Sequence, residues 1–395
     1  MFSFRLGVLS VLALAIPSVA LAQTAPRGPL VIVVNGAPTN NATGPSSPTA
    51  NVTIQGASPN GEVKVPLKSL YHLAATWKLA GEGGWDYLTM DASAHRLYIP
   101  RGTRIQVLDS LTGALIGEVP GVTGAHGVAL DSELHRGFAT SGRDNTVLVF
   151  DTQTLKPIGQ PIPVGDRPDA ITYDPFTKRV LAFDAGEGAN GNAATIIDAQ
   201  SLKVVASVPL GSNPESAVPD GKGSVWVNIE GSSEIVQLDA AKGVIVGRHS
   251  LAPGEEPTGI GLDVANGRVF SGCANKKMIV TDTKTGKQLA AVPIGEGVDA
   301  GAFDPKNGLA FASNGRDGTL SVVNFASDSS VVVVQNIPTH VGARTMALDP
   351  TNGDVFVVAA DYLPAEPVAA GERPRRPRMV PGSAIVMRFQ RNSTP

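Results

Sequence analysis

Apolar residues run through this chain in short continuous stretches, and one six-residue frame returns with them seven times. Each copy starts with a polar residue, continues with four mostly small or apolar residues and ends in Asp. The copies occupy residues 86–91, 126–131, 169–174, 215–220, 258–263, 299–304 and 344–349. Their first positions lie 40 to 46 residues apart, a spacing typical of β-propeller blades that hold several short strands each.

Each repeat is predicted to contain four strands. A first strand ends in the Asp of the frame, and a turn rich in Gly, Pro and Asn follows it, as in residues 304–308 and 349–353. These residues favour tight chain reversals. The apolar runs are continuous instead of alternating, which indicates strands that are covered on both faces, as in stacked blades.

The last repeat lacks a fourth strand, because its third apolar run, 384–389, leads directly into the C-terminus. Residues 71–81 have the pattern of an isolated fourth strand placed before the first repeat. We therefore predict an all-β fold, a seven-bladed β-propeller over residues 70–390, whose ring is closed by the N-terminal strand completing the last blade. Residues 361–383 form a Pro/Arg-rich insertion, expected to be an extended basic loop, and 391–395 a short tail.

The first 22 residues have the pattern of a secretory signal peptide. Arg5 precedes an apolar run over 6–16, and Ala20 and Ala22 form a small-x-small cleavage site. The run is too short to span a membrane, so we expect cleavage, a periplasmic or secreted location and no membrane span in the mature chain. Residues 23–69 are rich in Gly, Pro, Ser and Thr and are predicted to be a flexible tether.

Composition narrows the function classes. The 395 residues include 44 Gly and 30 Pro, which suits a fold with many turns. Cys273 is the only cysteine, so no internal disulfide can form and packing must stabilise the chain. A net charge of −3 argues against non-specific nucleic-acid binding. We expect a monomer.

The first positions of the seven frames should meet in one ring, because the innermost strands of a propeller line its channel. The expected channel-mouth residues are Asp86, His126, Asp169, Glu215, Thr258, Asp299 and Arg344. The loops after the second strands should surround the same face and supply a rim of Arg143, Asn228, Glu230, Cys273, Asn275 and Asn314. Both charge signs occur in this set, which suits a polar ligand or a peptide. The alternative is that the ring residues only satisfy channel waters and neighbouring backbone groups.

Crowded carboxylates raise one another's pKa unless a cation compensates them. Ring closure would bring Arg344 next to the first blade, where it can pair with Asp86 and Asp299. His126 falls between Asp86 and Asp169, a mixed N/O set that could hold a divalent ion. We expect no cofactor and no metal, and leave Ca²⁺ or Mg²⁺ on the carboxylates as the alternative. A copper or zinc centre is less favoured, because the sequence has no His-x-His motif and no cluster of several histidines.

Catalytic motifs are missing from the sequence. It contains neither a Gly-x-Ser-x-Gly elbow nor a phosphate loop, and no base accompanies Cys273, which is expected to be a buried, inert thiol. No Cys-x-x-Cys-His heme-attachment motif occurs. We therefore predict no catalytic residues.

Several segments together resemble the YVTN-type β-propeller repeat proteins, the YncE-like group of exported bacterial proteins. They include Pro-Asp-Ala at 168–170, Gly-Arg-Asp-Asn-Thr at 142–146 and Gly-Ala-Arg-Thr-Met-Ala-Leu-Asp-Pro at 342–350. The resemblance extends over residues 70–390, although the literal Tyr-Val-Thr-Asn tetrapeptide is absent. It implies an exported seven-bladed propeller without a settled activity.

These observations favour an exported binding or scaffold protein that uses the channel mouth and the rim loops to hold a partner protein or a small polar ligand. A metal-assisted hydrolase of lactonase type, with Glu215 or Asp169 as base, is the alternative. A DNA-binding propeller, as proposed for one branch of the resembling group, is less favoured because the expected ring is acidic.

Overall fold

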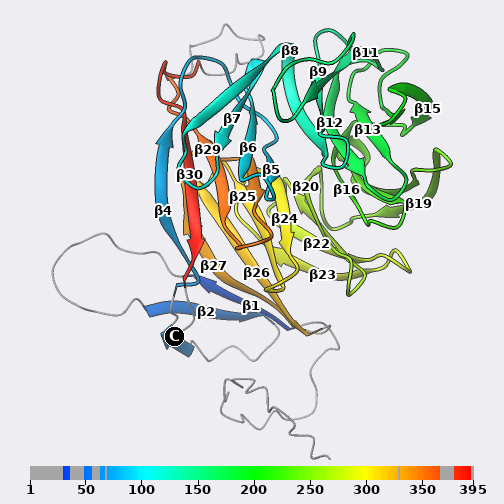
Figure 1. Cartoon of the computed structure of the whole chain (residues 1–395). Helices are drawn as coiled ribbons and strands as arrows, with labels where there is room; N and C mark the ends of the chain where they lie inside the picture. The colour runs from blue at the N-terminus through cyan, green and yellow to red at the C-terminus, as the bar shows by residue number, and fades with distance from the viewer. Residues whose placement is uncertain are drawn as a thin grey trace, which may run out of the picture.

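Nearly all regular secondary structure in the described part of the chain is β-strand (Figure 1). The computed structural model describes residues 30–35, 49–55, 63–66, 69–327, 330–364 and 378–392. The predicted all-β class is confirmed, and one short 3₁₀ turn, η1 (Glu230–Ser232), interrupts the strands. The expected signal peptide, most of the 361–383 insertion and residues 393–395 lie outside the described residues. None of the described helices has the length and apolar character needed to cross a membrane.

The third, fourth and fifth repeats each form one four-stranded antiparallel sheet in chain order. The sheet of the third repeat contains β12 (Pro168–Asp174), β13 (Arg179–Asp184), β14 (Ala193–Asp198) and β15 (Lys203–Pro209). The sheet of the fourth repeat contains β16 (Pro214–Pro219), β17 (Ser224–Ile229), β18 (Glu234–Asp239) and β19 (Val244–Ser250). The sheet of the fifth repeat contains β20 (Pro257–Asp263), β21 (Arg268–Cys273), β22 (Lys277–Asp282) and β23 (Gln288–Pro293).

The first two repeats share one long strand, β8 (Leu115–Asp131), which pairs with β7 over its first part and with β9 over its second. The remaining strands of these repeats are β5 (Thr89–Asp91), β6 (Arg96–Pro100), β7 (Gly102–Asp109), β9 (Arg136–Ser141), β10 (Thr146–Asp151) and β11 (Ile162–Pro163). One continuous strand therefore serves as the outermost strand of one repeat and the innermost strand of the next.

The last repeat takes its fourth strand from the N-terminal side of the chain. Its sheet has the order β28 (Met346–Leu348), β29 (Val355–Ala359), β30 (Ile385–Arg391) and β4 (Tyr71–Lys78). Figure 1 shows β4 in blue beside β30 in red, and in their register Val386 lies opposite Trp77. The predicted pairing of the isolated N-terminal strand with the last strand is present.

The segment predicted to be a tether contains three strands, which is a difference from the expectation. β1 (Leu30–Asn35) pairs in parallel with β27 of the sixth repeat, and β2 (Thr49–Gln55) and β3 (Val63–Pro66) extend the sheet from β1. The rest of the sixth sheet is β24 (Val298–Asp304), β25 (Leu309–Asn314), β26 (Thr319–Ser327) and β27 (Ser330–Pro338). The apolar run at residues 30–34 has strand-forming residues, and β27 offers it an unpaired edge.

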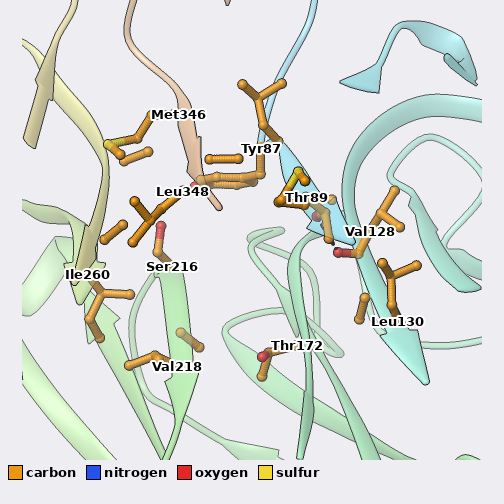
Figure 2. Close-up of a pocket in the computed structure, with 18 of the residues that line it drawn as sticks. Tyr87, Thr89, Val128, Leu130, Thr172, Ser216, Val218, Ile260, Met346 and Leu348 are labelled. Carbon is orange, nitrogen blue, oxygen red and sulfur yellow. Dashed lines mark hydrogen bonds between the residues drawn. The ribbon is translucent and has the colours of Figure 1, made fainter. Parts of the chain in front are cut away.

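The core lies between adjacent sheets, where apolar side chains from both sheets interdigitate. Phe270 of β21 stacks against Phe303 of β24 with 5.3 Å between ring centroids. The innermost strands contact one another in the order β5, β8, β12, β16, β20, β24 and β28, and β28 contacts β5. These strands surround a cavity of about 690 Å³, into which side chains such as Val128, Val218 and Ile260 project (Figure 2).

The Asp that ends each frame holds the turn after the innermost strand. Asp131 Oδ1 accepts hydrogen bonds from the N–H groups of Glu133 and Leu134, and Asp304 Oδ1 accepts from Lys306 and Asn307 in the equivalent turn. Such a side chain replaces backbone partners that a tight turn cannot supply. The last position of the frame is therefore structural, because its Asp fixes the turn at one end of the innermost strand. The first position of the frame, which varies between repeats, lies at the other end of the same strand.

Candidate functional site

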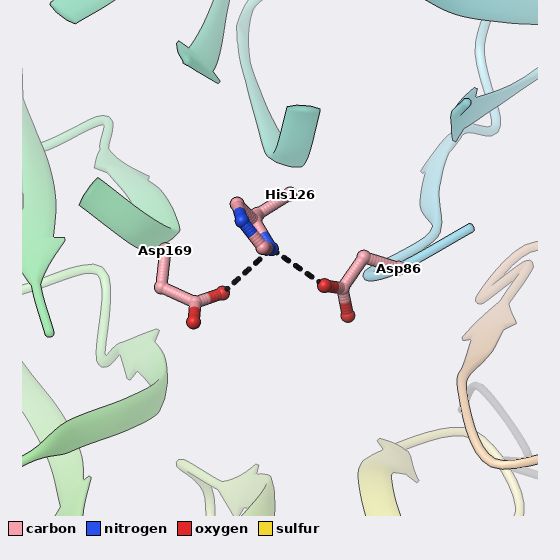
Figure 3. Close-up of side chains that lie close together, drawn as sticks. All are labelled: Asp86, His126 and Asp169. Atoms are coloured by element: carbon pink, nitrogen blue, oxygen red, sulfur yellow. Dashed lines mark hydrogen bonds and ion pairs between the residues drawn. The ribbon is translucent and has the colours of Figure 1, made fainter. Parts of the chain in front are cut away.

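Five of the seven predicted mouth residues form one network of ion pairs and hydrogen bonds, namely Asp86, His126, Asp169, Asp299 and Arg344. His126 lies within β8, in the part that begins the second repeat. Asp169 is the second residue of β12, and Asp86 lies just before β5. His126 Nδ1 is 2.7 Å from Asp86 Oδ2 and 3.3 Å from Asp169 Oδ1, so one ring nitrogen faces two carboxylates from different repeats (Figure 3). The frame alone predicted that these residues would meet.

Arg344 lies between two further carboxylates, as the sequence predicted. Its Nε donates to Asp299 Oδ2 at 2.6 Å, and its Nη2 is 3.7 Å from Asp86 Oδ1. The same Nη2 donates to the Trp85 carbonyl at 3.2 Å, and the guanidinium carbon is 5.9 Å from the centroid of the Trp85 ring. Arg344 therefore links the last repeat to the first and to the sixth.

Tyr87 is a member of the site that the sequence reasoning missed. Its hydroxyl donates to Glu215 Oε2 at 2.5 Å, although Tyr87 comes from the first repeat and Glu215 from the fourth. The innermost strands of these repeats are not neighbours, so this hydrogen bond crosses the space that the strands surround. Tyr87 also lines the cavity below (Figure 2). We call Asp86, Tyr87, His126, Asp169, Glu215, Asp299 and Arg344 the mouth cluster.

A signal for Tyr87 is present in the sequence. At the second position of the frame, the other six copies have Gly127, Ala170, Ser216, Gly259, Ala300 and Thr345. All six are small, and Tyr87 is the one large aromatic residue in this series. A single long side chain among small ones can reach across a ring of strands without meeting a counterpart.

The carboxylates of the mouth cluster lie in an environment that disfavours charge. Burial raises the pKa of Asp169 and of Asp299 to about 6, and burial together with the charge of Asp169 raises the pKa of Glu215 to about 8. Burial acts against the charged form of His126, but the Asp86 hydrogen bond and the Asp169 charge outweigh it, so the pKa of His126 is raised. The mouth cluster therefore has a surplus of acidic groups that its own cations do not fully compensate.

The mouth cluster is also accessible from solvent. The exposed fraction of the side chain is 18% for Asp86 and Asp169, 25% for Asp299 and 29% for His126. These groups are enclosed enough to interact strongly and open enough to meet a ligand.

Thr258, the remaining predicted mouth residue, has a different role. It is buried, and its hydroxyl donates to the Val298 carbonyl of the neighbouring innermost strand at 2.8 Å. This hydroxyl holds two strands together and does not join the mouth cluster.

Three of the predicted rim residues are inside the protein, which corrects their proposed role as ligand-binding groups. Asn228, Cys273 and Asn314 are fully buried, because each belongs to a strand and not to the loop that follows it. Asn228 Nδ2 donates to the carbonyls of Thr258 and Gly259. Burial raises the pKa of the Cys273 thiol to about 12, as expected for an inert cysteine.

The other three rim residues lie at the surface or near it. Arg143 is exposed, and Glu230 accepts a 2.6 Å hydrogen bond from Asn213 Nδ2, which also reaches Glu215. Asn275 is partly buried and its side chain bonds the backbone of Pro253 and Glu255, so it holds a loop. Arg143 and Glu230 therefore remain candidates for ligand contact at the rim.

Arg344→Ala is expected to destabilise the fold by about 1–3 kcal/mol, because Asp299 and Asp86 lose their shared cation while they stay partly buried. The exposure of Arg344 keeps the effect below that of a fully buried pair. Denaturant unfolding of the purified protein measures the change. Arg316→Ala is the matched control, since Arg316 is 78% exposed and pairs with Glu296 at the surface. Equal stability of the two variants would contradict the role of Arg344.

Comparisons with known proteins place few limits on this site. No protein-family model and no curated protein matches the chain. Among solved structures, a chain of hydrazine synthase from Kuenenia stuttgartiensis is similar, with 17% sequence identity and a TM-score of 0.43. The match covers 62% of this chain and 97% of that chain. A similarity at this level carries no argument about function, so the strand pairings and the site geometry must supply it.

Proposed function

We propose that this chain is an exported, seven-bladed β-propeller of the YVTN repeat type, closed by β4 in its last blade. The unbroken series of contacts from β5 to β28 and back to β5 supports seven blades. The pairing of β4 with β30 supports the closure. Export is inferred from the signal-like pattern of residues 1–22, and the repeated six-residue frame supports the family.

We infer that the protein is a binding or scaffold module whose mouth cluster holds a positively charged group of a small polar ligand or of a partner protein. The observation that carries this function is the imbalance of charge at one accessible point. The mouth cluster contains four carboxylates from four repeats but only one guanidinium and one imidazole. An added cation would favour the charged form of these carboxylates, whose pKa values are raised first by burial and then by their mutual repulsion.

Binding of a tetralysine peptide tests this function, and a tetraglutamate peptide, which has the opposite charge, is the control. Isothermal titration in buffer with EDTA should show saturable binding of tetralysine and none of tetraglutamate. At pH 9, above the pKa of about 8 of Glu215, Glu215→Gln should weaken tetralysine binding about fivefold, because it removes one partly buried charge from the mouth cluster.

The same substitution at Glu133 provides the control. Glu133 is 73% exposed and pairs with Lys178 in the turn at the far end of an innermost strand. Glu133→Gln changes the net charge equally but should leave the affinity unchanged. Equal weakening by both variants would show diffuse attraction to an acidic protein and would refute a defined site.

A metal-assisted hydrolase of lactonase type is the second candidate, favoured by the convergence of Asp86, His126 and Asp169 on one point. Hydrolysis of simple lactones that depends on Ca²⁺ or Mg²⁺ and is lost in Asp169→Ala would select it over the binding function. Nucleic-acid binding is disfavoured by the same charge surplus, since carboxylates at the mouth repel phosphate.

A further inference from the structure

We propose that Asp86, His126 and Asp169 form a binding site for one divalent transition-metal ion, of which Zn²⁺ is the representative. The proposal rests on the proposed function only in placing a cation at the mouth cluster, and it names the cation and the three ligand atoms. The ligands are His126 Nδ1 and one carboxylate oxygen from each Asp.

The positions of the three atoms fit such an ion. Zinc bonds imidazole nitrogen and carboxylate oxygen at about 2.0–2.2 Å, so two atoms on one tetrahedral ion are separated by about 3.4 Å. The distances from His126 Nδ1 to the two carboxylate oxygens, 2.7 and 3.3 Å, lie close to this separation. All three ligand atoms lie within 4.8 Å of one another. A small opening of the Asp86 contact would admit the ion.

The type of ligand decides between classes of metal. Ca²⁺ takes six to eight oxygen ligands, and Mg²⁺ prefers an octahedral oxygen set that is mostly water. Here the central ligand atom is an imidazole nitrogen, which suits zinc and its neighbours in the transition series. The structure therefore shifts the expectation from Ca²⁺ or Mg²⁺, which the carboxylates alone suggested, toward a transition metal.

Two threonine hydroxyl groups hold the three ligand-bearing segments together. Thr140, which is fully buried, accepts from the N–H of Gly127 at 2.9 Å and donates to the Asp169 carbonyl at 2.8 Å. It therefore ties the residue after His126 to Asp169. Thr89 donates to the Val128 carbonyl at 2.6 Å and ties the segment of Asp86 to β8. These bonds to backbone groups fix the relative positions of the segments that carry the three ligands.

Gly142 packs against the imidazole from the opposite side. A Cβ at this position would lie 3.0 Å from His126 Nε2 and 3.2 Å from the Pro168 carbonyl. The glycine therefore lets the loop after β9 come close to the ring, which keeps Nδ1 pointing at the two carboxylates.

The three ligands leave room for a further one. Three protein ligands with an open fourth position are typical of zinc sites that accept water or an external ligand. The ligand side chains are 18–29% exposed, so water or an external ligand can reach the site. A double positive charge would also compensate the carboxylates that Arg344 alone leaves in surplus.

Titration of the EDTA-treated protein, freed of chelator, with ZnCl₂ tests the proposal. Calorimetry should give one ion per chain, and thermal unfolding should shift upward with Zn²⁺ but not with the same concentration of CaCl₂. His126→Gln and Asp169→Asn should each weaken Zn²⁺ binding at least about tenfold. Glu133→Gln, a change in an exposed turn outside the mouth cluster, should leave it within about threefold.

His95→Asn controls for surface histidines, since His95 is exposed in a turn and should not affect binding. If the ligand variants fold poorly, nitrogen NMR of the wild-type protein replaces them: Zn²⁺ should shift the Nδ1 resonance of a single histidine. Unchanged Zn²⁺ affinity in His126→Gln, or Ca²⁺ binding as tight as Zn²⁺ binding, would overturn the site. Tetralysine binding is measured in EDTA, so its failure would refute the proposed function without touching this result.

Discussion

A chain that begins at Gly81 is expected to lose its cooperative unfolding transition, whereas a chain that begins at Ser69 keeps it. The shorter chain lacks β4, which buries Tyr71 and pairs with β30 over its whole length. It also lacks Leu79 and the contact of Trp77 with Phe356. Burial of each large apolar side chain contributes about 1.5–3 kcal/mol, so their loss approaches the whole stability of a typical domain, about 5–15 kcal/mol.

The chain from Ser69 is the matched control, because it lacks the upstream strands but retains β4 and its attachment. Gln335 Oε1 accepts from the N–H groups of Leu70 and Tyr71, which fixes the start of β4 on the sixth repeat. The shorter chain should also self-associate, since β30 becomes an unpaired edge. Adding a peptide of residues 69–82 should restore the transition. Indistinguishable circular-dichroism melting curves for the two chains would contradict ring closure by β4.

Asp184→Asn is expected to stabilise the protein above pH 7 and to flatten the pH dependence of its stability. Asp184 is fully buried, and burial raises its pKa to about 7. The folded state therefore holds a proton that the unfolded state releases near pH 4. The stability from this proton is complete below about pH 4 and is lost as the pH rises to about 7, by up to about 4 kcal/mol.

The variant stays neutral throughout this range. Its side-chain oxygen can keep the hydrogen bond from Thr195 Oγ1, which is 2.6 Å long in the wild type. Urea unfolding at pH 5, 7 and 8.5 measures the difference between wild type and variant, in which the other titrating groups cancel. Asp109→Asn is the control of opposite sign, because hydrogen bonds from Thr112 lower the pKa of Asp109. A constant difference for Asp184→Asn across the three pH values would refute the interpretation.

The repeat frame predicted most of the strands and part of the site. Its final Asp marks a turn that needs a side-chain acceptor, so the end of every innermost strand could be located from the sequence. The first position is one strand length earlier and therefore falls at the opposite end. This spacing alone predicted that Asp86, His126, Asp169 and Arg344 lie close together, because equivalent positions of stacked repeats face one axis.

The rim could not be predicted in the same way. Asn228, Cys273 and Asn314 stand within one residue of a strand end, where a shift of one position separates a buried residue from an exposed one. Amide and thiol groups occur both in the interior and at the surface. Contacts with a neighbouring repeat place these three residues in the interior. Tyr87 was not predicted because its distinguishing property is side-chain size, whereas charge is what varies at the first position of the frame.

The hydrogen bond from Tyr87 to Glu215 spans the central channel beside the mouth cluster and narrows it there. We expect a ligand that reaches Asp169 or Asp299 to be hindered by the Tyr87 side chain from entering the cavity that Tyr87 lines. The molecule is therefore suited to face-on capture of a projecting charged group, and passage through its axis would require Tyr87 to swing away.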